Sequence, residues 1–179
     1  MPTFGTKSKA VHKTLHTLLQ RLTSRVVLYY DISLLEGHRD EQRQNKLLAS
    51  GSTKVGWPKS LHNTNPSMAV DVSPSPTPHA WGDLGNLSGK ARDDAWKERV
   101  KFYQVVAVFQ YVWGEMQADH EALWKCLSRE RAEDLGYVAH RFTLRFGADW
   151  DSDGDYRDQT FDDLVHIEIC PTEPGGGEQ

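Results

Sequence analysis

The chain of 179 residues has the size of one domain and is long enough to bury a substantial core without disulfide bonds or a structural metal. Its two cysteines, Cys126 and Cys170, are too few for a disulfide framework and are not spaced like a zinc knuckle. The net charge of −4 is unevenly divided, because residues 1–60 hold 10 Lys and Arg against 4 Asp and Glu. The basic residues are interspersed with apolar ones and neither sign is extreme, so we expect no nucleic-acid binding.

The opening residues 1–25 lack the continuous apolar segment of a signal peptide. No stretch of the sequence approaches the roughly 20 apolar residues that span a membrane. We therefore expect a protein that is made in a cytoplasm and is not inserted into a membrane.

The first third of the sequence predicts a helix, a strand and a second helix. Apolar residues at helical spacing predict a helix over residues 8–27, with basic residues on its outer side. Residues 28–37 predict a short strand, and residues 39–51 a short polar helix, each ended by a glycine. A loop rich in Gly, Ser, Thr, Asn and Pro then leads through His62 to a strand at residues 69–73.

The second half predicts helices first and strands last. Residues 91–118 and about 120–135 have the strongest helical pattern, and residues 140–147 and 164–170 predict strands on either side of an acidic loop. A broad apolar face predicts that the first helical tract is largely buried. That face is traced by Trp96, Val100, Tyr103, Ala107, Tyr111 and Gly114, and it is broadened by Val105, Val106, Phe109 and Val112.

Helices interspersed with strands and joined by short loops predict an α+β fold, with a small, mostly antiparallel sheet flanked by helices. We expect one domain over residues 1–170 and a disordered tail over residues 171–179. We expect the chemistry at the ends of the strands, with a metal site at one edge of the sheet.

A carboxylate within an apolar strand indicates where that chemistry lies. Asp71 needs a partner, because an unpaired buried carboxylate is costly. His62 and His166 can supply two imidazoles beside it, and three such ligands are what a catalytic zinc ion takes. Asp163 precedes the last strand, where a general base can reach the water at the metal. Glu168 shares a strand face with His166.

Each of these features is weak alone, because a histidine in a strand is more often a hydrogen-bonded core residue than a metal ligand. Together, "S-x-H" at Ser60 and His62, "A-x-D" ending at Asp71, and "D-x-x-H-x-E" at residues 163–168 resemble the zinc peptidases of lysostaphin, D-Ala-D-Ala peptidase and hedgehog type. Within that group the sequence is most similar to phage endolysins that cut the L-alanyl-D-glutamate bond of peptidoglycan stem peptides. The similarity covers most of the chain and includes "FGTKS" near the start, "EGHRDEQRQ" at residues 36–44 and the segment 144–168.

The resemblance implies a role for each matching residue. It implies that His62, Asp71 and His166 bind Zn²⁺ and that Asp163 is the catalytic base. It also implies that Arg39 faces the carbonyl of the substrate and stabilises the developing oxyanion. From its position beside His166, we expect Glu168 to hold a ligand histidine or a group of the substrate. Ser60 is expected to form a hydrogen bond near the site, with an ordinary loop position as the alternative. The loop between His62 and Asp71 is two residues longer than in the family and lacks its usual glycine, which affects the rim of the pocket more than the metal.

Seven aspartates and one arginine lie within residues 149–163. Asp149, Asp151, Asp153 and Asp155 alternate around Gly154, as in the first half of a calcium loop. The twelfth position is Thr160 instead of the bidentate glutamate, so a solvated acidic loop is the alternative. Calcium-regulated endolysins have an acidic loop at this place, and the resemblance therefore implies that Ca²⁺ orders the loop and sets Asp163 and His166 in position.

The resemblance also implies a partner and a place of action. It implies a monomeric enzyme that acts on the peptidoglycan stem peptide, is made in the cytoplasm of an infected host, and reaches the cell wall after release through a separate holin-type pore. Two alternatives remain at this point. One is a D-Ala-D-Ala carboxypeptidase of the same zinc group, which the metal motif cannot distinguish. The other is a non-catalytic calcium- or wall-binding module, against which the complete set of site residues counts.

Overall fold

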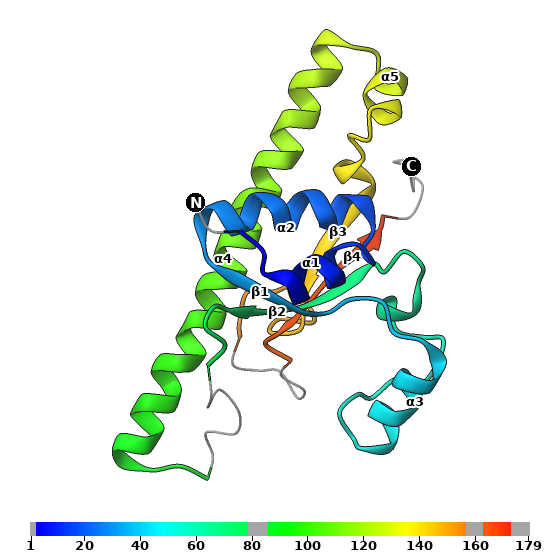
Figure 1. The fold of residues 1–179 in the computed structure, drawn as a ribbon. Coiled ribbons are helices and arrows are strands. Elements are labelled where there is room, and N and C mark those ends of the chain that lie inside the picture. The colour runs from blue at the N-terminus through cyan, green and yellow to red at the C-terminus, as the bar shows by residue number, and fades with distance from the viewer. Residues whose placement is uncertain (1–2, 79–85, 157–162, 173–179) are drawn as a thin grey trace.

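The computed structural model describes residues 3–78, 86–156 and 163–172. Its elements are arranged around one four-stranded sheet (Figure 1). In chain order they are α1 (Thr6–His12), α2 (Thr17–Tyr29), β1 (Ile32–Glu36), α3 (Glu41–Ala49), the 3₁₀ turn η1 (Leu61–Asn63), β2 (Ala69–Pro74), α4 (Gly89–Cys126), α5 (Arg129–Asp134), the 3₁₀ turn η2 (Ala139–Arg141), β3 (Phe142–Phe146) and β4 (His166–Pro171).

The strands lie in the order β1-β2-β4-β3, and each neighbouring pair is antiparallel. The predicted α+β fold with an antiparallel sheet flanked by helices is therefore confirmed. Strands β2 and β4 are central, and their register sets Asp71 directly opposite His166 and Ala69 opposite Glu168. Two residues separated by 95 positions in sequence are thus neighbours in the sheet.

The hydrophobic core covers one face of this sheet. Val70 and Val72 of β2 and Ile167 and Ile169 of β4 are buried in it together with apolar side chains of α2 and α4. Because side chains alternate along a strand, the residues between them point to the opposite face. Those intervening residues include Asp71, His166 and Glu168, so the alternation separates the apolar core from the polar site.

The single helix predicted over residues 8–27 is wrong, because the chain forms two helices there, α1 and α2. The backbone between them pairs with the loop before β2: the Ser67 N–H donates to the Thr14 carbonyl (2.8 Å), and the His16 N–H donates to the Ser67 carbonyl (2.7 Å). His16 then begins α2, with its Nδ1 accepting from the Leu18 N–H at 3.2 Å. A backbone committed to these long-range bonds cannot continue a helix.

The prediction of two helical tracts over residues 91–135 also needs correction. Helix α4 is continuous for 38 residues, and only the short α5 follows it. Its predicted buried face is wrong, since Trp96 is 48% and Tyr111 57% exposed. The real buried face packs on α2 and the sheet, and it includes the four residues expected to broaden the predicted one, Val105, Val106, Phe109 and Val112. Phe102, Trp113 and Met116, which were not predicted, are buried with them. The helix is not largely buried; it extends past the sheet at both ends (Figure 1).

The ordered chain reaches further toward the C-terminus than expected. Pro171 pairs with Phe142 in the sheet, and the Thr172 N–H donates to the Arg141 carbonyl at 2.8 Å. Residues 173–179 of the expected tail lie outside the described residues. Among the described helices, none combines the length and the apolar character needed to cross a bilayer.

Candidate metal centre

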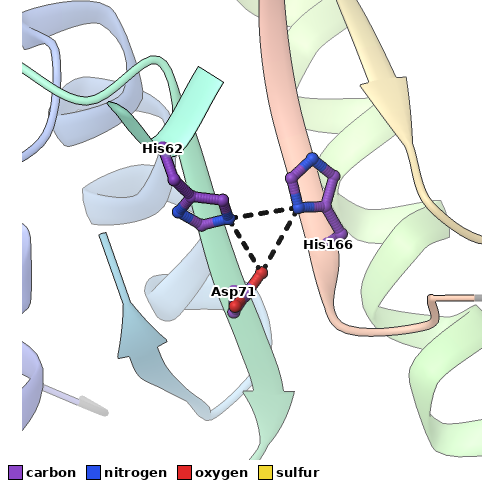
Figure 2. Close-up of side chains that lie close together, drawn as sticks. All are labelled: His62, Asp71 and His166. Carbon is purple, nitrogen blue, oxygen red and sulfur yellow. Dashed lines mark hydrogen bonds and ion pairs between the residues drawn. The ribbon is translucent and has the colours of Figure 1, made fainter. Parts of the chain in front are cut away.

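Three side chains from separate parts of the chain converge on the polar face of the sheet, where β4 begins. The atoms that face one another are His62 Nε2, Asp71 Oδ1 and His166 Nδ1 (Figure 2). They are separated by 3.1 Å (His62 to Asp71), 3.2 Å (His62 to His166) and 3.3 Å (His166 to Asp71). All three residues are buried, and His62 completely so.

The spacing and the chemistry of these donors fit a zinc ion. Tetrahedral zinc binds nitrogen and oxygen at about 2.0–2.1 Å, which places two ligand atoms roughly 3.3–3.4 Å apart. Two imidazole nitrogens and one carboxylate oxygen are also the ligands of many catalytic zinc sites. The trio therefore can hold a zinc ion with little rearrangement.

His62 is fixed by the short turn η1 and by one hydrogen bond from its ring. Ser60 caps this turn: its Oγ accepts from the His62 N–H (3.3 Å), and the Asn63 side chain accepts from the Ser60 N–H (3.2 Å). His62 Nδ1 lies 2.6 Å from the Gly37 carbonyl, to which it donates. That bond leaves the lone pair of Nε2 directed at the other two donors. Ser60, predicted to lie near the site, thus acts through the backbone of His62.

Asp71 is held in place by an arginine. Arg39 Nη2 donates to Asp71 Oδ2 at 2.5 Å, and Arg39 Nε donates to Glu36 Oε2 at 2.7 Å. The second oxygen of Asp71 is thereby left for the cluster. Burial would raise the pKa of Asp71, but hydrogen bonds with His166 and His62 outweigh it and hold the pKa well below its usual range. Arg39 was predicted to face the substrate carbonyl, and it lines the cleft while it also binds this carboxylate.

His166 is oriented by Glu168, its neighbour on the same strand face. Its Nε2 lies 2.9 Å from Glu168 Oε2, and Arg145 Nε donates to Glu168 Oε1 at 2.6 Å. Burial opposes the charge on Glu168, but its bonds to His166 and Arg145 lower its pKa to about 2. Burial likewise opposes protonation of His166, yet Asp71 and Glu168 raise its pKa to about 9. The two carboxylates therefore favour a proton on His166, and a metal ion competes with that proton for the ring.

An aromatic residue that the sequence analysis did not select covers this histidine. The Trp150 ring lies 5.2 Å from the His166 ring with an interplanar angle of 33°, and the Arg145 guanidinium lies 5.6 Å from the centre of the Trp150 ring. The positive guanidinium over the ring is a favourable cation–π arrangement. Trp150 stands within the acidic segment, between Asp149 and Asp151, and no periodic pattern in the sequence marks it as part of the site.

Asp163 lies beside the cluster and is tied to the end of β3. Its N–H donates to the Gly147 carbonyl (2.9 Å), and its own carbonyl accepts from the His166 N–H (3.0 Å). Burial raises the pKa of the Asp163 carboxyl, and the negative charge of Asp71 adds to the rise. A carboxylate with a raised pKa is a better proton acceptor, as a general base requires.

A cleft of about 560 Å³ connects these residues. Asp71, His166 and Glu168 contribute to its lining from the two central strands, and Asp163 lies beside them. The other contributors come from β1 and α3, from the segment between α3 and η1, and from the region around β3 and β4: Glu36, Arg39, Arg43, Leu47, Ser52, Thr53, Lys54, Val55, Lys59, Ser60, Leu61, Arg145, Trp150 and Val165. A cavity of similar volume, about 570 Å³, lies between α2 and α4 and contains none of the cluster's residues.

The arrangement of the whole chain is similar to that of a known peptidase. The fold resembles that of Serratia marcescens L-Ala D-Glu endopeptidase ChiX. The two structures match over 94% of this chain and 90% of that chain, with a TM-score of 0.55 and 16% sequence identity. At this identity the likeness concerns the fold. No protein-family model matches the sequence, and no curated protein matches it either.

The acidic segment brings three of its four predicted calcium ligands together. Carboxylate oxygens of Asp149, Asp151 and Asp153 lie within 4.8 Å of one another. Asp149 is only 5% exposed; its Oδ2 accepts from the Gly154 N–H at 3.2 Å, while its Oδ1 is buried without a hydrogen-bond partner in the described part of the chain. Asp155 does not belong to this group, and its N–H donates to Asp153 at 2.7 Å.

Proposed function

We propose that the chain is a zinc-dependent peptidoglycan endopeptidase that hydrolyses the L-alanyl-D-glutamate bond of stem peptides. The observation that carries the proposal is the buried trio of His62, Asp71 and His166, whose spacing suits zinc. Two of the three, Asp71 and His166, line a cleft together with Asp163. The likeness in fold to an L-Ala D-Glu endopeptidase supports the choice of bond.

In this proposal His62, Asp71 and His166 hold the zinc ion. When bound, zinc polarises the scissile carbonyl and lowers the pKa of water toward about 7. The protein's own contribution is to keep three donors in one arrangement: the Gly37 carbonyl orients His62, and Glu168 orients His166. Such outer partners raise ligand basicity and fix the ring tautomer.

Asp163 moves the protons. It accepts one proton from the attacking water and delivers one to the leaving amine, and its raised pKa suits both steps. Arg39 keeps Asp71 in place through Nη2. The same guanidinium lines the cleft, where its positive charge stabilises the oxyanion that develops on the substrate carbonyl.

Mass spectrometry of digested peptidoglycan tests the proposal directly. We expect the zinc-loaded wild type to produce new termini at L-Ala and D-Glu. Asp163→Asn should bind zinc normally but turn over roughly 10²- to 10⁴-fold more slowly, because it lacks the proton acceptor. Asp93→Asn, an exposed change on α4 outside the cleft, is the matched control and should behave as wild type. Release of terminal D-Ala alone would indicate a carboxypeptidase, and absence of cleavage by zinc-loaded protein would indicate a wall-binding module.

We further propose that Asp149, Asp151 and Asp153 bind Ca²⁺. The buried Oδ1 of Asp149, which has no hydrogen-bond partner among the described residues, supports this. An unpaired buried carboxylate oxygen is costly, and hard oxygen ligands are what Ca²⁺ prefers. Trp150 follows Asp149 directly and packs on His166. An ion that fixes the conformation of this segment would therefore also fix the ring that covers His166.

Calcium titration calorimetry on zinc-loaded protein measures this second site. Asp151→Asn should weaken Ca²⁺ binding and Asp155→Asn, outside the group of three, should not. Turnover that stays unchanged when a selective chelator removes calcium, with zinc buffered, would refute the regulatory role. The phage origin, the delivery through a holin-type pore and the monomeric state stay predictions.

A further inference from the structure

One carboxylate at the rim of the cleft holds two arginines. Glu36 Oε2 accepts from Arg39 Nε, and Glu36 Oε1 accepts from Arg43 Nε, both at 2.7 Å. Arg39 continues to Asp71 in the trio. Arg43 has no equivalent second partner within the described residues, so its two terminal nitrogens remain available while its Nε fixes the plane of the guanidinium.

The wall formed by α3 and the segment that follows it is basic. Arg43, Lys54 and Lys59 line the cleft from this side. The carboxylates of the lining are already engaged for the most part: Glu36 holds the two arginines, Asp71 binds Arg39, and Glu168 binds Arg145. Lys59 forms no ion pair in the described part of the chain. Among the described residues, the charge of Arg43 and Lys59 on this wall is therefore matched only partly.

A guanidinium fixed at Nε suits one kind of ligand group. Its two terminal N–H groups form a planar fork that binds a carboxylate through two parallel hydrogen bonds. Because Glu36 already immobilises Arg43, little conformational entropy remains to be lost when a ligand binds. The side chain is 48% exposed and accessible from the cleft.

We infer that Arg43, assisted by Lys59, binds a free carboxylate of the peptide substrate and makes the enzyme select stem peptides that have one. The inference rests on the proposed function, in which the residue released from alanine is a glutamate. That glutamate has a free α-carboxylate next to the scissile bond, and the next residue of a stem peptide can supply another. Arg43 is thus a specificity-determining residue that distinguishes free acids from amidated peptides.

Four synthetic stem peptides test the inference, with the glutamate α-carboxylate free or amidated and the carboxylate of the next residue free or amidated. For the wild type we expect one of the two amidations to lower kcat/KM roughly 5- to 20-fold, mainly through KM, because a charge-assisted hydrogen bond is lost. The amidation that does so identifies the carboxylate that is bound. In Arg43→Gln the same amidation should have no effect, and Lys59→Gln should show a reduced preference.

Arg25→Gln is the matched control. Arg25 is similarly exposed, at 42%, and pairs with Asp119 away from the cleft, so this variant should keep the wild-type preference. The preference of the wild type should also shrink at high salt, since exposed charges are screened. Equal kcat/KM for all four peptides in the wild type, or an undiminished preference in Arg43→Gln, would overturn the inference.

Calorimetric binding of the four peptides to zinc-loaded Asp163→Asn separates this inference from the proposed reaction. Preferential binding of the free acid, lost in the double variant with Arg43→Gln, supports the subsite even if the wild type cleaves none of the peptides. If the wild type cleaves the peptides but Asp163→Asn binds all four with equal affinity, the carboxylate subsite is refuted and the proposed reaction is not.

Discussion

Gly147 lies where the end of β3 packs against Asp163 and the first residue of β4. A Cβ atom on this residue would be 2.4 Å from the Asp163 carbonyl oxygen and 2.9 Å from the Cβ atoms of both Asp163 and His166. The backbone there is also bonded in both directions, because the Gly147 N–H donates to the His166 carbonyl at 2.8 Å. Because Gly147 has no side chain, the proposed base Asp163 and the proposed zinc ligand His166 can both lie close to its backbone.

Gly147→Ala should therefore displace both residues. We expect it to lower the free energy of unfolding by about 1–3 kcal/mol, as overpacking does. We also expect a fall in kcat/KM on a stem peptide that is larger than the decrease in the fraction of folded protein. Urea denaturation and turnover measure the two effects. Gly114→Ala in the exposed part of α4 is the control: a Cβ there meets nothing within 4 Å, and alanine should stabilise the helix by about 0.5–1 kcal/mol. Wild-type turnover in Gly147→Ala would contradict this account.

Glu168→Gln should weaken zinc binding without preventing folding. The glutamine can still contact His166, but it removes the negative charge that raises the basicity of the imidazole. We expect a 10- to 100-fold loss of affinity, roughly the usual effect of a carboxylate behind a ligand histidine. Competition with a chromophoric zinc chelator measures it. Glu121→Gln, exposed on α4, should leave the affinity unchanged, and an equal effect of the two variants would disprove the positioning role.

At the residue scale, sequence motifs selected side chains that do meet in space. Up to 104 positions separate His62, Asp71 and His166, yet the three side chains converge. Each motif could be recognised in the sequence because its spacing reflects a local strand or turn. The sequence did not predict that Trp150 and Glu36 belong to the site. Their contacts join different elements, and such contacts leave no periodic signal in the sequence. Zinc binding itself stays a proposal.

At the scale of elements, α3 braces the turn that presents His62. Gln44 of this helix is fully buried; its Nε2 donates to the Val55 carbonyl (2.8 Å), and its Oε1 accepts from Asn63 Nδ2 (3.2 Å). Asn63 belongs to η1 and also donates to the Arg39 carbonyl at 3.2 Å. One buried amide thus connects the helix, the segment after it and the turn η1 that carries His62.

Gln44→Ala should loosen this connection. It leaves the Val55 carbonyl and the Asn63 amide short of a partner, which costs about 1–3 kcal/mol in the free energy of unfolding. Zinc affinity should fall as well, because His62 is no longer held by a braced turn. Thermal denaturation and zinc competition measure the two effects. Gln117→Ala, exposed on α4, should change neither quantity. If Gln44→Ala loses stability but keeps its zinc affinity, the turn η1 positions His62 without help from α3.

The positions of the strands could be predicted from the sequence better than the packing of the helices. Alternation along β2 and β4 separates core residues from site residues by local geometry alone. The break between α1 and α2 depends on backbone bonds to Ser67, which lies about fifty residues away. For α4, apolar residues occur on more than one side, and only contact with α2 and the sheet decides which side is buried.

For the whole molecule, a metal bound by the trio would join the turn η1 to the two central strands. The donors come from parts of the chain that are distant in sequence and adjacent only after folding. An ion that binds the native state and not the unfolded chain stabilises the native state by mass action. Zinc loading should therefore raise the stability of the entire fold and not merely that of the site.

Calorimetry of zinc-loaded and chelator-treated protein tests this coupling. At a free zinc concentration about 1,000 times Kd, binding contributes about 4 kcal/mol. For a chain of this length each kcal/mol shifts Tm by about 2–4 °C, so we expect chelation to lower Tm by about 8–16 °C. His166→Ala should abolish that shift because one ligand is missing. His12→Ala, whose ring contacts Ser24 and Gln20 instead, should retain the shift whatever its own effect on Tm. If chelation lowered the Tm of His166→Ala by as much as that of the wild type, the metal would bind elsewhere.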